Sequence, residues 1–287
     1  MSPLSHFLLL IAAPLALGRA LLDLHLPLFP EHPYPEKPYP EPPYPEPTPP
    51  PPELTCDKYG YLIQYAQLIR IDIDTGGYET VGTAIGDNSA VNALGYNPLD
   101  NLLYGYQGST NQVIRIAADG SSSIAATLQN AAGYILGDFD AQGYYWVATQ
   151  NAATWIKIDL RPGSPAYGQA VETGTTPSPG RSVADWVYVP IAGPYLWSVG
   201  ANPIGGASLI RWGFATHQWE IIANYPGIDN GFGALYGINN GTIFASNNAN
   251  GRIWAFSLLD NTQPYIASQG PPSGSNDGAR CVANVEI

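Results

Sequence analysis

The sequence predicts an all-β domain, a five-bladed β-propeller, preceded by a secretory signal and a proline-rich stalk. The first observation is a short strand-like segment of one type that occurs five times in a chain of 287 residues. The second is the absence of long helical periodicity, with β-branched and aromatic runs separated by Gly, Asn and Asp. The third is a concentration of prolines, 14 of 28, between residues 27 and 52. These observations divide the chain into residues 1–20, 21–53 and 54–287.

Residues 1–20 have the pattern of a signal peptide. The apolar run Phe7–Leu17 is followed by Gly18, Arg19 and Ala20, whose small residues suit signal peptidase. This run is too short for a stable membrane anchor, and no later stretch stays apolar for the roughly 18 residues that a span requires. We therefore expect a secreted protein, extracellular or attached to the cell wall, without a membrane span.

Residues 21–53 are expected to form an extended stalk. The motif Pro-Tyr-Pro-Glu begins at Pro33, Pro38 and Pro43, a five-residue period. Such a segment lacks the backbone N–H groups that a helix or sheet needs, so it favours polyproline II. It serves either as a solvated spacer or, through the tyrosines of the motif, in wall association or cross-linking.

The repeated segment sets the number of blades. Its copies start 45, 42, 54 and 44 residues apart, which is the spacing of four-stranded propeller blades. The copies are Leu68–Asp72, Val113–Ala117, Trp155–Asp159, Leu209–Gly213 and Ile253–Ser257. Each is followed by a turn and one further strand, and an Asp-Gly pair such as Asp119-Gly120 suits a tight hairpin there. An irregular β-sandwich is the alternative fold.

Two more strands precede each of the last four copies and complete their blades. The predicted innermost strands are residues 93–96, 135–138, 183–186 and 233–236. The first copy lacks an innermost strand, and the segment Asn276–Cys281 at the end of the chain has the small-residue character of one. The C-terminal strand should therefore close blade one. In an oxidising compartment, a disulfide between Cys56 and Cys281 would staple the two ends of the ring.

Acidic residues near the predicted inner strands form the candidate ligand site. Asp138, Asp185 and Asp277 occupy similar positions, with Asn92 nearby, and would converge at the mouth of the central channel. Three carboxylates there would favour a hydroxyl-rich ligand or a calcium ion, although no metal-ligand set or cofactor is assigned. Trp186 could provide a sugar-stacking surface beside them. The alternative is that each Asp simply accepts backbone N–H bonds in a turn.

Composition restricts the range of functions. The net charge of −12, with nine Lys or Arg against seventeen Asp or Glu in residues 54–287, argues against nucleic acid as a partner. Catalytic residues are also scarce. The four Glu residues of the domain lie outside the predicted inner strands, and its single histidine, His217, falls in a turn and is interpreted as a surface residue. Asn240-Gly-Thr242 is the usable glycosylation sequon.

Four motifs together resemble a known family. They are Asn92-Ala-Leu-Gly-Tyr-Asn-Pro98, Gly137-Asp-Phe-Asp140, Ala184-Asp-Trp-Val-Tyr188 and Asn276-Asp-Gly-Ala-Arg-Cys281. The combination resembles a domain of unknown function from secreted fungal proteins and bacterial surface proteins, over nearly all of residues 54–287. The resemblance implies secretion and a repeated, propeller-like β-fold. It assigns no catalytic residue.

The sequence therefore favours a binding module over an enzyme. We expect a secreted, wall- or surface-associated propeller that binds a cell-wall polysaccharide or a surface protein. One alternative is a glycoside hydrolase or lyase that uses the inner-strand aspartates, by analogy with enzymes of the same fold. The other alternative is a structural wall or coat protein.

Overall fold

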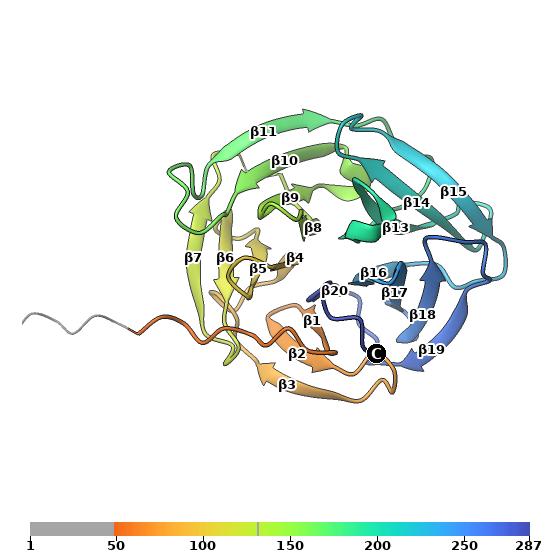
Figure 1. Ribbon diagram of the computed structural model, residues 1–287, viewed down its shortest axis with the longest axis horizontal. Coiled ribbons are helices and arrows are strands. Elements are labelled where there is room, and N and C mark those ends of the chain that lie inside the picture. The colour runs from red at the N-terminus through yellow and green to blue at the C-terminus, as the bar shows by residue number, and fades with distance from the viewer. Residues whose placement is uncertain (1–48, 131) are drawn as a thin grey trace, which may run out of the picture. The chain divides into compact units, whose positions relative to one another are not determined.

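The computed structural model describes residues 49–130 and 132–287, which form five four-stranded antiparallel sheets. The sheets are arranged as blades around a central axis (Figure 1), so the predicted five-bladed propeller is confirmed. The predicted signal peptide, residues 1–20, and nearly all of the stalk, residues 21–53, lie outside the described residues.

Each blade runs from an innermost strand at the axis to an outermost strand at the rim. In the order of blades one to five, the innermost strands are β20 (Asp277–Arg280), β4 (Val91–Asn97), β8 (Leu136–Phe139), β12 (Val187–Tyr188) and β16 (Phe232–Ile238). The second strands are β1 (Gly60–Gln64), β5 (Leu102–Gln107), β9 (Tyr144–Ala148), β13 (Tyr195–Ala201) and β17 (Thr242–Asn247). The third strands are β2 (Gln67–Ile71), β6 (Gln112–Ile116), β10 (Thr154–Asp159), β14 (Ala207–Gly213) and β18 (Arg252–Ser257). The outermost strands are β3 (Tyr78–Gly82), β7 (Ser122–Thr127), β11 (Ala170–Thr175), β15 (Trp219–Tyr225) and β19 (Tyr265–Gln269).

The C-terminus closes blade one, as the sequence predicts. Strand β20 pairs antiparallel with β1, and Gly60 lies opposite Arg280. The Cys56–Cys281 disulfide joins the two ends of the propeller, with 5.2 Å between the Cα atoms and a sequence separation of 225. Because β20 is a strand of the same sheet as β1–β3, the ring is closed both by hydrogen bonds and by a covalent bond.

The repeated segment owes its pattern to cross-strand pairs. On the third strand of four blades, a cation lies opposite an aromatic residue of the second strand. The pairs are Arg70 with Tyr61, Arg115 with Tyr104, Lys157 with Trp146, and Arg211 with Trp197. In blade four, Arg211 also donates to Glu220 of the outermost strand, at 2.7 Å and 2.9 Å. The hydrophobic residues beside each cation point to the other face of the sheet and into the core.

The innermost strand of blade four differs from its prediction. The sequence predicts residues 183–186, whereas β12 consists of Val187–Tyr188. The backbone ahead of β12 pairs with β13 at Ser182 and Ala201, and side chains bond the residues between. The Val183 N–H donates to Asn151 Oδ1 at 2.8 Å, and Ser198 Oγ donates to the Asp185 carbonyl at 2.5 Å. The predicted strand is therefore wrong by a few residues, because these polar contacts replace ladder hydrogen bonds.

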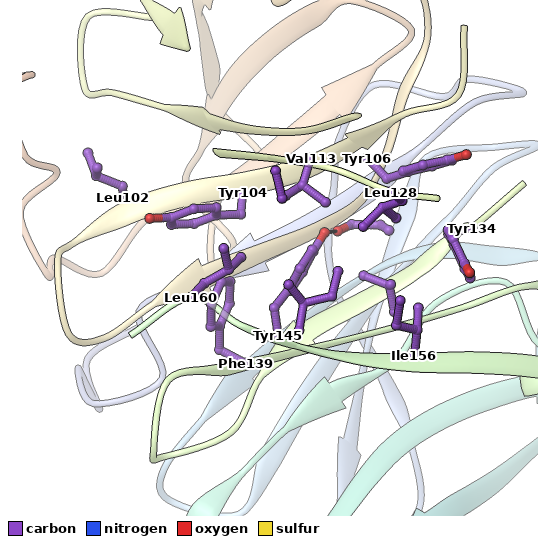
Figure 2. Packing of buried hydrophobic residues seen from close by; sticks show 14 of the residues in the cluster. Leu102, Tyr104, Tyr106, Val113, Leu128, Tyr134, Phe139, Tyr145, Ile156 and Leu160 are labelled. Atoms are coloured by element: carbon purple, nitrogen blue, oxygen red, sulfur yellow. Dashed lines mark hydrogen bonds between the residues drawn. The ribbon is translucent and has the colours of Figure 1, made fainter. Parts of the chain in front are cut away.

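The hydrophobic core lies between neighbouring blades. Between blades two and three, Phe139 stacks on Tyr145 with 4.8 Å between ring centroids, and Tyr104 lies 5.1 Å from Phe139. Figure 2 shows this cluster, with Leu102 and Tyr104 at one end and Tyr134 and Ile156 at the other. Its residues come from strands of both blades, so the contact fixes one blade against the next.

Tryptophans fill the corresponding space between blades three and four. Trp212 lies at the centre, with ring centroids 5.6 Å from Trp146, 5.4 Å from Trp155 and 5.5 Å from Trp186. All four side chains are buried. Large rings packed edge to face bury extensive apolar surface with little loss of side-chain freedom, which suits the interface between two rigid sheets.

Candidate functional site

The three predicted aspartates meet near the propeller axis. Asp138 lies on β8, Asp185 lies two residues before β12, and Asp277 is the first residue of β20. Asp185 and Asp277 are 1% and 0% exposed, and Asp138 is half-buried. Asp185 and Asp277 thus lie within the packed axis, whereas Asp138 keeps part of its surface exposed.

Two of the aspartates brace one blade against the next. Asp138 Oδ2 accepts the Tyr188 N–H of blade four at 2.7 Å, and Asp185 Oδ2 accepts the Leu235 N–H of blade five at 2.6 Å. Innermost strands of neighbouring blades belong to different sheets, so their inward N–H groups lack a ladder partner. Each carboxyl supplies that acceptor. The sequence alternative, in which Asp accepts backbone N–H bonds, describes these contacts, although the donors come from the next blade.

Burial raises the pKa of all three carboxyl groups. Burial raises the pKa of Asp138 to about 7, against the backbone hydrogen bonds that lower it. Burial also raises the pKa of Asp185 and of Asp277 well above the usual range, and the negative charge of Asp277 contributes to the shift at Asp185. Asp277 Oδ1 accepts the Gly278 N–H, and backbone N–H groups of Leu94 and Ala93 in blade two also lower its pKa, although burial outweighs them. A bound proton removes the cost of burying the charge.

Asn92 and Trp186, the other predicted site residues, have local roles in the structure. Asn92 Oδ1 accepts the N–H of Ala93 at 3.0 Å, in a bulge of β4 where Ala93 has φ of 55°. Trp186 is fully buried in the tryptophan cluster, and its ring faces Trp212 and Trp219. Its stacking surface is therefore covered by protein.

A pocket on the axis opens at the face where the five innermost strands end. Its volume is about 190 Å³, and every blade contributes to its lining. The residues that follow or end the inner strands include Tyr96, Asp138, Asp140, Tyr188, Asn239 and Arg280. Because one residue or more comes from each blade, the pocket is centred on the propeller axis. Asp138 links this axial pocket to the buried aspartates.

Polar contacts hold the wall of the axial pocket in place. Asp140 Oδ1 accepts the N–H groups of Gln142 and Tyr144 at 3.0 Å, and Oδ2 accepts Trp146 Nε1 at 2.9 Å. Asn239 Oδ1 accepts the Ile191 N–H at 2.9 Å. These hydrogen bonds fix the orientation of the Asp140 and Asn239 side chains within the protein.

Arg280 is the cation of the axial pocket. It is 4% exposed, and its guanidinium donates to the carbonyl oxygens of Lys58, Cys281, Asn284 and Glu286. Burial lowers its pKa to about 10, so the side chain stays charged at neutral pH. The axial pocket therefore offers a cation, a carboxyl group that titrates near neutrality and two tyrosine rings.

Sequence reasoning did not identify Tyr96, Asp140, Tyr188, Asn239 or Arg280 as site residues. They share one detectable feature, which is their position at or just after the end of an innermost strand. Of the residues predicted from the sequence, Asp138 lines this pocket.

Neither a metal centre nor a membrane helix is found in the described part of the chain. Within residues 49–130 and 132–287, no group of three or more His, Cys, Asp or Glu side chains is arranged to hold a metal ion. No helix there is long and apolar enough to cross a membrane.

Several solved structures are similar to this chain at low sequence identity. A chain from a nidogen–laminin complex matches with a TM-score of 0.51 and 10% identity, covering 75% of this chain and 80% of that one. A gluconolactonase of Xanthomonas campestris matches with a TM-score of 0.45 and 14% identity, covering 77% of this chain and 74% of that one. A virginiamycin B lyase of Staphylococcus aureus matches with a TM-score of 0.45 and 15% identity, covering 75% of this chain and 69% of that one. Identities this low carry no information on function. No curated protein matches the chain.

The family comparison covers most of the propeller. Residues 61–283 match the model of a family, DUF6923, that is described as a repeat of unknown function. These bounds run from β1 to the residues just after β20, so they include strands of all five blades and both partners of the closing contact. The chain therefore belongs to the DUF6923 family, and the repeat of that family forms the blades of a five-bladed propeller in this protein.

Proposed function

We propose that the protein is a secreted, wall- or surface-associated binding module that holds the end group of a glycan in its axial pocket. The observation that carries the proposal is a pocket lined by Asp138 and the rings of Tyr96 and Tyr188, beside the positive charge of Arg280. A carboxyl group binds sugar hydroxyls, and tyrosine rings cover the apolar face of a sugar, whereas the Arg280 guanidinium already donates to backbone carbonyls and supplies only its charge. A volume of about 190 Å³ is below the roughly 300–1,000 Å³ of sites for drug-sized ligands, so we expect one end group to enter.

Binding is favoured over hydrolysis because of how the carboxyl groups are placed. Glycoside hydrolysis generally needs two carboxyl groups on either side of the scissile bond. Asp185 and Asp277 are closed off from solvent, and both oxygens of Asp140 already accept hydrogen bonds. Asp138 alone among the predicted aspartates lines the axial pocket.

Three features support an extracellular location for this binding module. The Cys56–Cys281 disulfide suits an oxidising compartment. The sequon residue Asn240 is exposed in the turn between β16 and β17, where a glycan could be attached. The sequence of residues 1–53 adds the signal peptide and the stalk, which would hold the propeller away from a wall.

The proposal is tested by a glycan array with the full-length secreted protein and the variant Asp138→Asn. We expect the wild type to bind glycans that share one end group, and the variant to bind them about tenfold more weakly, because the neutral amide accepts weaker hydrogen bonds from sugar hydroxyls than a charged carboxylate does. Asp119→Asn, which changes an exposed aspartate in the turn between β6 and β7, is the matched control and should bind as the wild type does.

A polysaccharide-release assay with the same three proteins tests the enzyme alternative. The binding proposal predicts no release of sugar by any of them. Release by the wild type that is lost in Asp138→Asn would contradict it in favour of a hydrolase or lyase. Absence of binding to every glycan, together with capture of a surface protein from the native wall, would assign the protein-binding role instead.

A further inference from the structure

A groove at the rim between blades two and three is a second candidate site, separate from the axial pocket. Its volume is about 580 Å³. Thr127 at the end of β7 lies on its blade-two side, and Thr173 and Thr175 of β11 lie on its blade-three side. Buried Tyr134 and Ile156 form part of its lining. In Figure 2 these two residues lie at the end of the hydrophobic cluster that is opposite Leu102.

The lining of this rim groove is polar but uncharged. Among the described residues, no Asp, Glu, Lys, Arg or His contributes to it, although the chain as a whole carries a net charge of −12. Its exposed polar side chains are all hydroxyls and carboxamides, namely Thr127, Gln129, Asn130, Thr154, Gln169, Thr173 and Thr175. Such groups both donate and accept hydrogen bonds. They match a neutral ligand that is rich in hydroxyl groups, and they offer no partner for an ionic one.

Trp155 provides an independent indication of a missing polar partner. The side chain is 2% exposed, and its Nε1–H has no hydrogen-bond acceptor among the described residues. A Cβ placed on Gly174 would lie 2.4 Å from Cζ2 and 3.1 Å from Nε1 of this indole. The N–H edge therefore lies against a groove-lining residue that has no side chain. Buried indole N–H groups normally have an acceptor. Trp186 and Trp197 have the same unpaired N–H, but of these three described tryptophans only Trp155 lines the groove.

We infer that the rim groove binds an internal stretch of a neutral polysaccharide. The uncharged lining favours an uncharged chain, and the exposed threonine and glutamine side chains form hydrogen bonds with its hydroxyl groups. The volume of the groove, 580 Å³, is about three times the 190 Å³ of the axial pocket. We therefore expect the groove to hold several sugar rings and the axial pocket to hold one end group. This inference shares the ligand class of the proposed function but none of its residues.

The inference is tested by calorimetry of the full-length protein with neutral and acidic oligosaccharides. The neutral probes are the β-1,4- and β-1,3-linked glucose oligomers and the chitin oligomers, from two to six sugars, and the acidic probe is a galacturonic acid hexamer. We expect affinity for one neutral series to rise by about tenfold or more from the dimer to the hexamer, because further rings reach further groove residues. The acidic hexamer should not bind.

Thr173→Trp is the variant that fills the groove. Thr173 is exposed and pairs with Ile156 in the strand ladder, and Thr80 of blade one is likewise exposed and pairs with Ile69. Thr80→Trp is therefore a control with the same substitution at the same register of another blade. We expect Thr173→Trp to weaken binding of the neutral hexamer by about tenfold or more, and Thr80→Trp to leave it unchanged.

Trp155→Phe tests the buried N–H group, because it removes the donor and keeps an aromatic ring. It should weaken binding of the hexamer by about two- to tenfold, as expected for one lost hydrogen bond. Circular dichroism of each variant verifies the fold before binding is measured.

Three outcomes would overturn the inference. One is that no neutral series binds, and another is that Thr173→Trp binds the hexamer as tightly as Thr80→Trp. The third is that Asp138→Asn abolishes binding of the hexamer while Thr173→Trp retains it, which would assign the ligand to the axial pocket. The third outcome would overturn the groove inference but not the proposed function of the axial pocket. Conversely, weaker array binding by Asp138→Asn would not change the result expected for Thr173→Trp. The experiments therefore test the two proposals separately.

Discussion

A single aspartate connects the architecture of the axis with its chemistry. Asp138 accepts a backbone N–H from the next blade, and it also lines the axial pocket. The same carboxyl group thus stabilises the ring and faces the space in which we propose that a ligand binds. Because burial raises its pKa to about 7, its charge changes within the range of extracellular pH.

The raised pKa of Asp138 predicts a pH-dependent effect of Asp138→Asn on stability. Between the unfolded pKa, about 4, and the folded pKa, the folded protein holds a proton that the unfolded chain has released. The stabilisation that this proton provides is complete below about pH 4 and is lost as the pH rises to about 7. Asn keeps an oxygen acceptor without a charge, so the variant should gain stability relative to the wild type over this interval.

Urea unfolding at pH 4 and pH 8 measures this difference. We expect nearly equal unfolding free energies for the two proteins at pH 4, and an advantage of about 1–3 kcal/mol for Asp138→Asn at pH 8, given that the side chain is half-buried. The difference between two proteins is needed because carboxyls such as Asp159, whose pKa Arg161 lowers, act in the opposite direction. An advantage that does not change with pH would contradict the prediction.

Individual residue positions were harder to predict than residue types. The inner-strand aspartates could be identified because acids are unexpected among the glycines and alanines of a crowded axis. Their partners could not, because the Tyr188 and Leu235 N–H groups lie 50 residues further along the chain. His217 shows the same limit: its ring centroid lies 4.3 Å from that of Trp155, a contact between blades that a turn pattern does not indicate.

At the scale of elements, regular strands were predictable and interrupted ones were not. The repeated segment predicts the third strand of every blade, and in four of them its alternation of buried aliphatic and cationic residues matches the two faces of a strand. Strand β12 departs from its prediction because Asn151 and Ser198 bond the backbone ahead of it. Side-chain hydrogen bonds of this kind do not produce a periodic sequence pattern from which they could be predicted.

Strand β20 depends on Arg280, whose guanidinium binds carbonyl groups from both ends of the propeller. Replacing it by Lys keeps the positive charge but loses the planar set of donors that reaches several carbonyls at once. We expect Arg280→Lys to lower the free energy of unfolding by about 2–3 kcal/mol, as measured by urea denaturation.

Arg252→Lys provides the control for this prediction. Arg252 is exposed on β18 and pairs with Asp229 at 3.5 Å, so its replacement should cost less than about 1 kcal/mol. Equal losses in the two variants would show that Arg280 acts only through its charge.

On the scale of the whole molecule, the closed ring was the most predictable feature. Five copies of one segment set the number of blades, and the shortage of strands at the start of the domain matched the extra strand at its end. The axial pocket was not predictable, because it exists only when the ends of five separate strands meet. Its residues come from positions between Tyr96 and Ala283.

The disulfide should contribute strongly to the stability of the ring. In the chain-entropy model, closing a loop as long as the 225-residue separation of Cys56 and Cys281 stabilises the folded state by about 3–5 kcal/mol. The double variant Cys56→Ser, Cys281→Ser should therefore unfold at lower urea concentration than the wild type. Dithiothreitol should lower the midpoint of the wild type towards that of the variant and leave the variant unchanged; identical midpoints without reductant would contradict this role.

The position of the disulfide also determines how the propeller bears mechanical load. A pull on the chain ahead of Pro49 reaches Cys56 before it reaches β1, and the covalent bond passes the force directly to Cys281, beside β20. Tension thus acts on two paired strands together and cannot peel the first strand away from the last. A propeller tethered through its N-terminal segment would in this way keep its ring closed under shear.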